Sequence, residues 1–250
     1  MTAAADPVND WLEAFAAFER GLDDDAPARR LQALRHDALE HFRSVGLPSS
    51  RDEDWRHTSL APIARLRFAL PCPPPAALPT SAQLEPLLLA GPAGPLLTFV
   101  DGRFVPGLSR QPPMPAGVTV ADLGAALRAG DPGVVAHLAR HAACRERPFA
   151  ALNTAFLDGG ALVRVASGQA LAMPVQVLSL RTPQAGPSHA HPRLLLVAEE
   201  QAQVAVVESH AGWDDGAYLT NAVTELVVQP GARVEHVLIQ QEGPRAWHVH

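Results

Sequence analysis

The chain has 250 residues, of which 47% are hydrophobic and 18% charged, and its formal net charge is −6. This length suffices for one large domain, or two modest ones, with a buried core. The net negative charge, spread along the chain, argues against binding to nucleic acid or to an anionic membrane, because proteins that bind these surfaces present a basic face. All 20 basic residues are arginine, so the chain has no lysine for Schiff-base or P-loop chemistry.

Cysteine content and hydropathy exclude further classes of protein. Two cysteines, Cys72 and Cys144, are too few for a zinc knuckle or a cysteine-ligated cluster, although one disulfide could join them. Residues 1–10 lack the basic and apolar regions of a signal peptide, and no apolar run reaches the length of about 18 residues that spans a membrane. We therefore expect a soluble, cytoplasmic protein that does not contact a membrane.

The first part of the chain, residues 1–60, predicts a helical segment. A helix capped by Asp10 carries Leu12, Phe15 and Phe18 at a spacing of three, and Gly21 with the acidic run 23–25 ends it. A second amphipathic helix follows and stops at the Gly-Leu-Pro of residues 46–48. The apolar stripes of both helices are typical of core packing.

The second part, residues 61–158, is a proline-rich connector. Thirteen of the 24 prolines lie between Pro62 and Pro115, and proline breaks helices and central strands, so we expect no regular core here. Apolar runs at 96–100 and 103–105 flank an Asp-Gly pair, which predicts a hairpin. Short helices are expected near 121–129, 133–144 and 148–157.

The third part, residues 159–250, changes to short strands rich in valine and leucine. The expected strands are 161–165, 175–180, 194–197, 204–208, 225–228 and 234–239. Turn segments that begin at Val165, Val197 and Val228 superpose at spacings of 32 and 31 residues. A fixed period in this range indicates stacked coils. An antiparallel sandwich of hairpins stays open as the alternative.

The apolar residues that flank these turns define the expected register. Val163, Leu195 and Leu226 precede the turns, whereas Val175, Val206 and Val237 follow them. We predict that the first three lie in register on one inner face of the stack.

The repeat is still running where the sequence stops. Residues 237–244 open a new loop, residues 247–250 read as the start of another strand, and no polar cap follows. We therefore expect a stack that is cut within its array and leaves Val237, Ile239 and Trp247 uncovered. Such an edge favours association with another chain.

Histidine is the residue type that most suggests chemistry. His189 with His191, and His248 with His250, form H-x-H pairs, which on a strand could present two imidazoles to one metal, as in cupin-like enzymes. His210 and His236 lie nearby in sequence.

The surrounding sequence weakens that interpretation. A cupin site needs a glutamate soon after the second histidine, and the first one here is Glu199. The prolines on both sides of the first pair favour turn or surface histidines. No nucleophile elbow or nucleotide-binding glycine motif is present either. We therefore assign no catalytic, cofactor-binding or metal-binding residue.

Four segments resemble one protein family, in the family's order. They are Gly46–Leu60 with its Asp-Glu-Asp-Trp-Arg run, Phe99–Ser109, Leu152–Gly168 and Tyr218–His236. The chain from about residue 46 onward resembles the SufB/SufD family of the SUF iron–sulfur cluster assembly system. The Asp-Glu-Asp-Trp run, and the absence of cysteine after Cys144, favour its SufD branch over SufB. His57 stands where a tyrosine is more usual. From the alternating charges around Trp55 we expect this indole to be largely buried.

The resemblance implies both a fold and a function. The fold would be mainly β with an α-helical N-terminal part and an incomplete, right-handed parallel β-helix. The function would be that of a non-catalytic scaffold subunit, acting with SufB and the SufC ATPase, or as a homodimer, in a complex that handles an iron–sulfur cluster. This chain itself would hold no cofactor, and it would lack the C-terminal region through which the family docks SufC. A cupin-like metal-dependent enzyme that uses the H-x-H pairs is the alternative.

Overall fold

A computed structural model describes residues 7–22, 26–71, 78–90, 94–142, 144, 147–213 and 215–250. The α-helices are α1 (Pro7–Glu19), α2 (Ala26–Val45), α3 (Ala61–Ala64), α4 (Ser81–Leu84), α5 (Leu123–Arg128), α6 (Pro132–His137) and α7 (Pro148–Ala155). The strands are β1 (Leu96–Val100), β2 (Arg103–Phe104), β3 (Val118–Asp122), β4 (Ala161–Val165), β5 (Val175–Arg181), β6 (Ser188–Ala190), β7 (Arg193–Ala198), β8 (Gln203–Gly212), β9 (Tyr218–Asn221), β10 (Val223–Val228), β11 (Arg233–Gln241) and β12 (Ala246–Val249). The acidic run 23–25 and Cys72 lie outside the described residues. None of the described helices is long and apolar enough to cross a bilayer.

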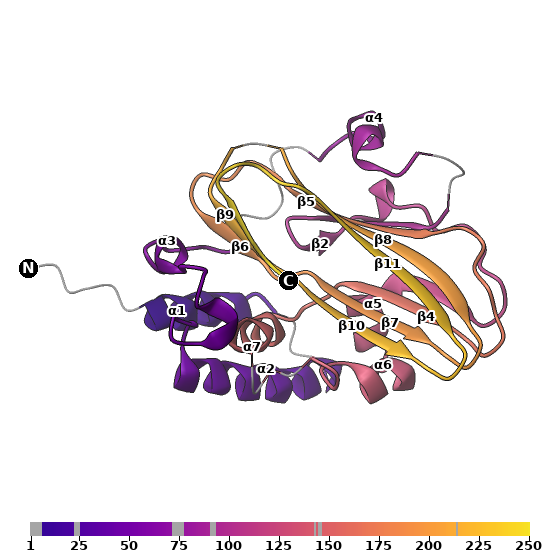
Figure 1. Cartoon of the computed structure of the whole chain (residues 1–250), viewed down its shortest axis with the longest axis horizontal. Helices are drawn as coiled ribbons and strands as arrows, with labels where there is room; N and C mark the ends of the chain where they lie inside the picture. Colours follow the sequence, from indigo (N-terminus) through magenta and orange to yellow (C-terminus); the bar gives the residue numbers. More distant parts are fainter. Residues whose placement is uncertain are drawn as a thin grey trace, which may run out of the picture.

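The two N-terminal helices that the sequence predicts are confirmed. Helix α1 begins at Pro7, three residues before Asp10. Its Trp11 and Phe15 are buried, and they join Phe42 of α2 and Phe149 of α7 in one apolar cluster. Figure 1 shows α1, α2 and α7 gathered beside the strands. This cluster attaches the helical part to the sheets.

The strands from β4 onward fall into three sheets with a regular recurrence. Each set of three consecutive strands gives one strand to each sheet, so that β4, β7 and β10 pair in parallel, as do β5, β8 and β11, and β6, β9 and β12. Strands one repeat apart therefore lie side by side (Figure 1). A sandwich of hairpins would instead pair consecutive strands in antiparallel fashion.

The proline-rich connector contributes to these sheets, which the sequence did not predict. The expected hairpin is present, with Phe99 opposite Phe104 and positive φ angles of 51° at Asp101 and 82° at Gly102. Its first strand, β1, is buried along its whole length and also pairs with β5. Strand β3 pairs antiparallel with β4 and occupies the start of the helix expected at 121–129. That helix, α5, begins only after its cap, Asp122.

The predicted register is wrong by one residue at β7. Val163 pairs with Leu196, and Leu196 pairs with Leu226. Leu195 points to the opposite face, toward α5, where it packs with Leu123. Both faces of β7 are buried, so its continuous apolar run carries no alternation that would fix the register. A similar shift places His236, not Val237, opposite Val206.

The face shared by Val163 and Leu196 forms the main apolar core, together with inward residues of β1, β5 and β8. Val163 and Leu196 are fully buried, whereas Leu226 in the last layer of this column is 39% exposed. The expectation of an inner position therefore holds for Val163, whereas Leu226 on the same face is partly exposed.

Candidate functional site

In the first histidine pair His189 is buried and His191 is half-buried, contrary to the expectation of surface or turn histidines. His189 lies on β6 and is 0% exposed, and its Nδ1 is 2.9 Å from Nε2 of His191. The flanking prolines border a strand of three residues rather than a turn. Trp11 and Phe156 present ring edges or faces to His189 at centroid distances of 5.1 and 4.8 Å.

Hydrogen bonds fix the roles of the nitrogens in this pair. The amide nitrogen of Asn221 donates to the Phe149 carbonyl and lies 3.1 Å from His191 Nδ1, which therefore accepts. His191 Nε2–H then donates to His189 Nδ1, and the remaining proton of neutral His189 sits on Nε2. Burial and the nearby Arg181 charge lower the pKa of His189 to about 3. The pair is thus neutral, and it does not present two imidazoles to one metal.

A second group of polar side chains lies between the sheets. On β8 the inward positions read Val204, Val206, Glu208 and His210, so the apolar core gives way to charge along a single strand. The other members come from β9 to β12, the loop before β12 and the residue that follows β12. We call this group the interior cluster; it comprises Glu208, His210, Thr220, Thr224, His236, Glu242, His248 and His250.

Glu208 is the hub of the interior cluster. Its two carboxylate oxygens accept hydrogen bonds from His210 Nε2 at 3.1 Å and His236 Nε2 at 2.9 Å, and the Thr224 hydroxyl donates at 2.8 Å. His250 Nε2 lies 3.1 Å from the same hydroxyl. Burial opposes ionisation of Glu208, yet the bonds from His210 and His236 outweigh it and hold the pKa of Glu208 below its ordinary value.

Glu242 plays the same part for His248 of the second H-x-H pair. It accepts from His248 Nδ1 at 2.7 Å and from the Thr220 hydroxyl at 2.6 Å. Burial disfavours the charged form, but these two bonds leave the pKa of Glu242 below its ordinary value. His248 lies on β12, as the sequence predicted, whereas His250 follows the strand. Their rings are 6.2 Å apart.

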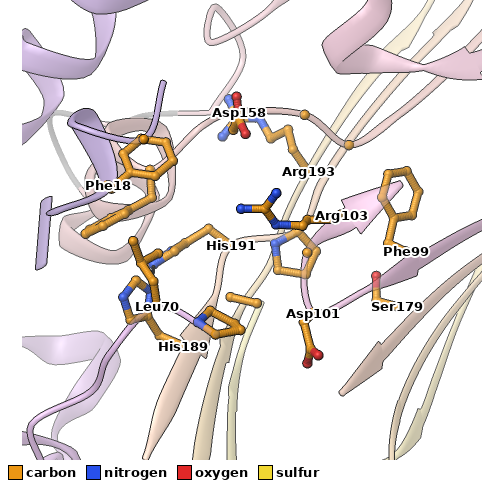
Figure 2. Close-up of a pocket in the computed structure, with 18 of the residues that line it drawn as sticks. Phe18, Leu70, Phe99, Asp101, Arg103, Asp158, Ser179, His189, His191 and Arg193 are labelled. Carbon is orange, nitrogen blue, oxygen red and sulfur yellow. Dashed lines mark hydrogen bonds between the residues drawn. The ribbon is translucent and has the colours of Figure 1, made fainter. Parts of the chain in front are cut away.

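A cavity of about 300 Å³ opens between α1, the β1–β2 hairpin and the loop before β4, and it reaches Glu208. Figure 2 shows the Arg103 side chain extending into this cavity, with His189 and His191 on one wall and Asp101 on another. A second hollow, of about 1120 Å³, lies on another side of the interior cluster and is lined by Thr224 and His250.

Trp55 also borders the second hollow. It is half-buried, not largely buried as expected, and its ring lies 5.3 Å from that of Phe149. The charges around it are partly paired, with Arg56 Nη1 3.0 Å from Glu53 Oε1. Because η1 (Glu53–Trp55) is a single turn of 3-10 helix on the surface, the indole packs on one side only.

Comparison with known families accounts for the order of the motifs. The model of the SufBD protein N-terminal region matches residues 7–177, and the model of the SufBD core domain of SUF system FeS cluster assembly matches residues 180–250. The first match alone covers more than half of the chain. The chain belongs to the SufBD family. The interior cluster of this SufBD protein lies wholly within the core-domain match.

Individual relatives agree with the family match. An iron–sulfur cluster assembly SufBD family protein of Synechocystis is 27% identical over 226 residues, which are 86% of this chain and 48% of the relative. The iron–sulfur cluster assembly protein SufD of Escherichia coli is 26% identical over 223 residues, which are 88% of this chain and 48% of that protein. Protein ABCI7 of Arabidopsis, which is chloroplastic, is 37% identical over 60 residues, which are 24% of this chain and 13% of that protein. The chain spans about half the length of the first two relatives.

Sequence reasoning found the histidines of the interior cluster but not their carboxylate partners. Glu208 and His236 are far apart in the sequence, and only the parallel pairing of β8 with β11 brings them together. The one local signal was the break in β8, where Glu208 and His210 continue the inward alternation of Val204 and Val206.

Proposed function

We propose that this SufBD protein is a non-catalytic scaffold component of the SUF system, acting with SufB and SufC in cytoplasmic iron–sulfur cluster assembly. The observation that carries the proposal is the succession of two family models over residues 7–177 and 180–250. Two relatives that align along most of the chain are named for the same process. The cluster is the cargo of the complex, and no residue of this chain is assigned to it.

The sheet pattern supports a further architectural proposal. We infer that β4 to β12 form a right-handed parallel β-helix in which each set of three strands is one coil. The recurrence of parallel pairs in three sheets supports this inference. A coil stack is stiff and offers a flat end surface, and both properties suit a scaffold that holds partners at a fixed separation.

The end surface of the last layer is our candidate for partner binding. Leu226, Val228 and Leu238 are 39%, 50% and 37% exposed. The counterparts of Leu226 and Val228 one layer below, Leu196 and Ala198, are fully buried. The free edges of β10, β11 and β12 also carry backbone groups that another strand could pair with. We propose that SufB strands add to this edge.

Co-expression of this chain with SufB and SufC tests the proposal. We expect the chain to co-purify with SufB and to retain SufC only when SufB is present. L226R and V228R should each abolish capture of SufB, because an arginine there is buried by the added strand without a partner. L78R, at a residue that is 50% exposed away from the edge, is the matched control and should not.

Two outcomes would contradict the proposal. Stoichiometric capture of SufC by this chain alone would place the ATPase-docking surface within residues 1–250. Self-association that consumes the edge, with no SufB captured, would make the partner a second copy rather than SufB.

A further inference from the structure

Two buried imidazole nitrogens in the interior cluster have no hydrogen-bond partner among the residues that the structure describes. They are His210 Nδ1 and His248 Nε2. His210 is 1% exposed, and the side chain of His248 is 10% exposed. A buried polar atom without a partner costs about 1–3 kcal/mol. Two such atoms on rings whose centroids are 4.8 Å apart are therefore a feature that needs an explanation.

The carboxylates determine which nitrogen of each ring carries the proton. Glu208 accepts from His210 Nε2, and Glu242 accepts from His248 Nδ1. In the neutral imidazole the opposite nitrogen then carries the lone pair. The lone-pair nitrogens are the two unpartnered ones. Histidines that bind metals have this same arrangement, with the second nitrogen donating to a carboxylate.

The charge of the interior cluster also favours a cation. In the described part of the chain, the partners of Glu208 and Glu242 are imidazoles and threonine hydroxyls. The other buried carboxylates each lie beside an arginine. Asp101 is 3.4 Å from Arg181, and Glu225 is 2.6 Å from Arg193. Two carboxylates without a permanent cation are thus held next to two lone pairs, and a divalent ion would balance their charge.

The spacing of the two rings agrees with a shared metal. Two imidazoles that bind one tetrahedral ion at about 2.0–2.1 Å have ring centres about 5 Å apart, close to the observed 4.8 Å. The cavity that reaches Glu208 and the hollow that reaches His250 border the interior cluster. No three histidine, cysteine or acidic side chains of the described residues converge as a complete metal site, so the remaining positions would be filled by water.

We propose that His210 and His248 bind a divalent transition-metal ion through Nδ1 and Nε2, respectively. Zn²⁺, Cu²⁺, Fe²⁺ and Ni²⁺ suit neutral imidazole ligands, and Co²⁺ serves as a spectroscopic probe. Glu208 and Glu242 are positioning residues that orient the rings. The His189–His191 pair is excluded, because its facing nitrogens are hydrogen-bonded to each other. This site does not depend on the proposed function, since it is a property of this chain alone.

Titration of the tag-free chain with Co²⁺, followed by visible absorption and calorimetry, tests the proposal. We expect one equivalent to bind with d–d bands typical of nitrogen and oxygen ligands. H210Q and H248Q should each weaken binding by more than about a hundredfold, and E242Q by about 10–100-fold. H57Q, at an exposed histidine, is the matched control and should bind like the unmodified chain.

The coordinating nitrogens give a second test that needs no variant. In ¹⁵N NMR of the unmodified chain, Zn²⁺ should shift two imidazoles, one bound through Nδ1 and the other through Nε2. Absence of binding, unchanged binding by both H210Q and H248Q, or coordination through two Nε2 atoms would overturn the proposal. If H210Q or H248Q fails to fold, the NMR signature decides by itself.

Discussion

Arg193 and Glu225 form a fully buried ion pair on the outer face of β7 and β10, with Nη2 2.6 Å from Oε1. The guanidinium also donates to Asn153 Oδ1 of α7 at 2.9 Å. The Glu225 carboxylate accepts the backbone N–H groups of Ala139 and His141. This one pair therefore ties two layers of the sheet to α7 and to the segment that follows α6.

Removal of one partner should be costly. Arg193→Met leaves the Glu225 carboxylate buried without its cation, and we expect the free energy of unfolding to fall by about 3–5 kcal/mol. Urea denaturation measures this change. Arg128 is 52% exposed and lies 3.6 Å from Asp122, so Arg128→Ala should cost less than about 1 kcal/mol. Equal losses in the two variants would contradict the structural role of the buried pair.

The buried imidazole of His189 predicts a loss of stability in acid. Its pKa is about 3 in the folded state and about 6.5 when unfolded. Between these values the unfolded state binds more protons, so the free energy of unfolding falls as the pH falls, by up to about 1.4 kcal/mol per pH unit from this group. H189Q should have a shallower slope between about pH 7 and 5, whereas H57Q should keep the original slope. Identical slopes for H189Q and the unmodified chain would refute the assignment.

Local signals were enough to predict the hairpin and helices α1, α2 and α7, whereas the helix expected near 133–144 ends at His137 and the short helices α3 and α4 were not predicted. Asp101 and Gly102 adopt the positive φ angles that their Asp-Gly pair favours. The short strands β6 and β9 escaped prediction because they form by pairing with distant segments: β9 lies between β6 and β12, and β6 also bridges Ala69. Strand β6 has three residues between prolines and shows no periodicity. His189 within it and His191 after it therefore read as part of a turn.

The repeat was visible, but its register was not. Apolar residues fill both faces of β7, so a shift of one residue matched the sequence equally well. The interior cluster could not be assembled from the sequence for a related reason. Glu208 and His236 meet only through the parallel pairing of strands one repeat apart, and an error of one residue moves a side chain to the other face.

The corrected register predicts that substitutions at paired positions of β7 and β10 lower the free energy of unfolding by unequal amounts. Leu196→Ala should lower the free energy of unfolding by about 2–5 kcal/mol, because it opens a cavity in a fully buried layer. Leu226 lies directly opposite it but is 39% exposed. Leu226→Ala should therefore cost less than about 1 kcal/mol in this chain. Thermal or urea unfolding checks both values, and a larger loss at Leu226 would show that the last layer is covered.

The two N-terminal tryptophans should also differ. Trp11 is 4% exposed and contacts the rings of Phe68 and Phe156, so Trp11→Ala should cost about 3–5 kcal/mol. Trp55 packs on Phe149 alone among the described ring contacts and is half-buried. Trp55→Ala should cost about 1–2 kcal/mol. A loss at Trp55 equal to that at Trp11 would indicate that the indole is more deeply anchored than its exposure suggests.

Amide hydrogen–deuterium exchange of this chain, with and without SufB, tests the scaffold proposal most directly. If SufB strands add to the last layer, exchange in β10, β11 and β12 should slow by at least about tenfold, because their free N–H groups become hydrogen-bonded. Exchange in α1 and α2 should not change. Unchanged exchange in the three strands, or protection confined to the helices, would contradict the account.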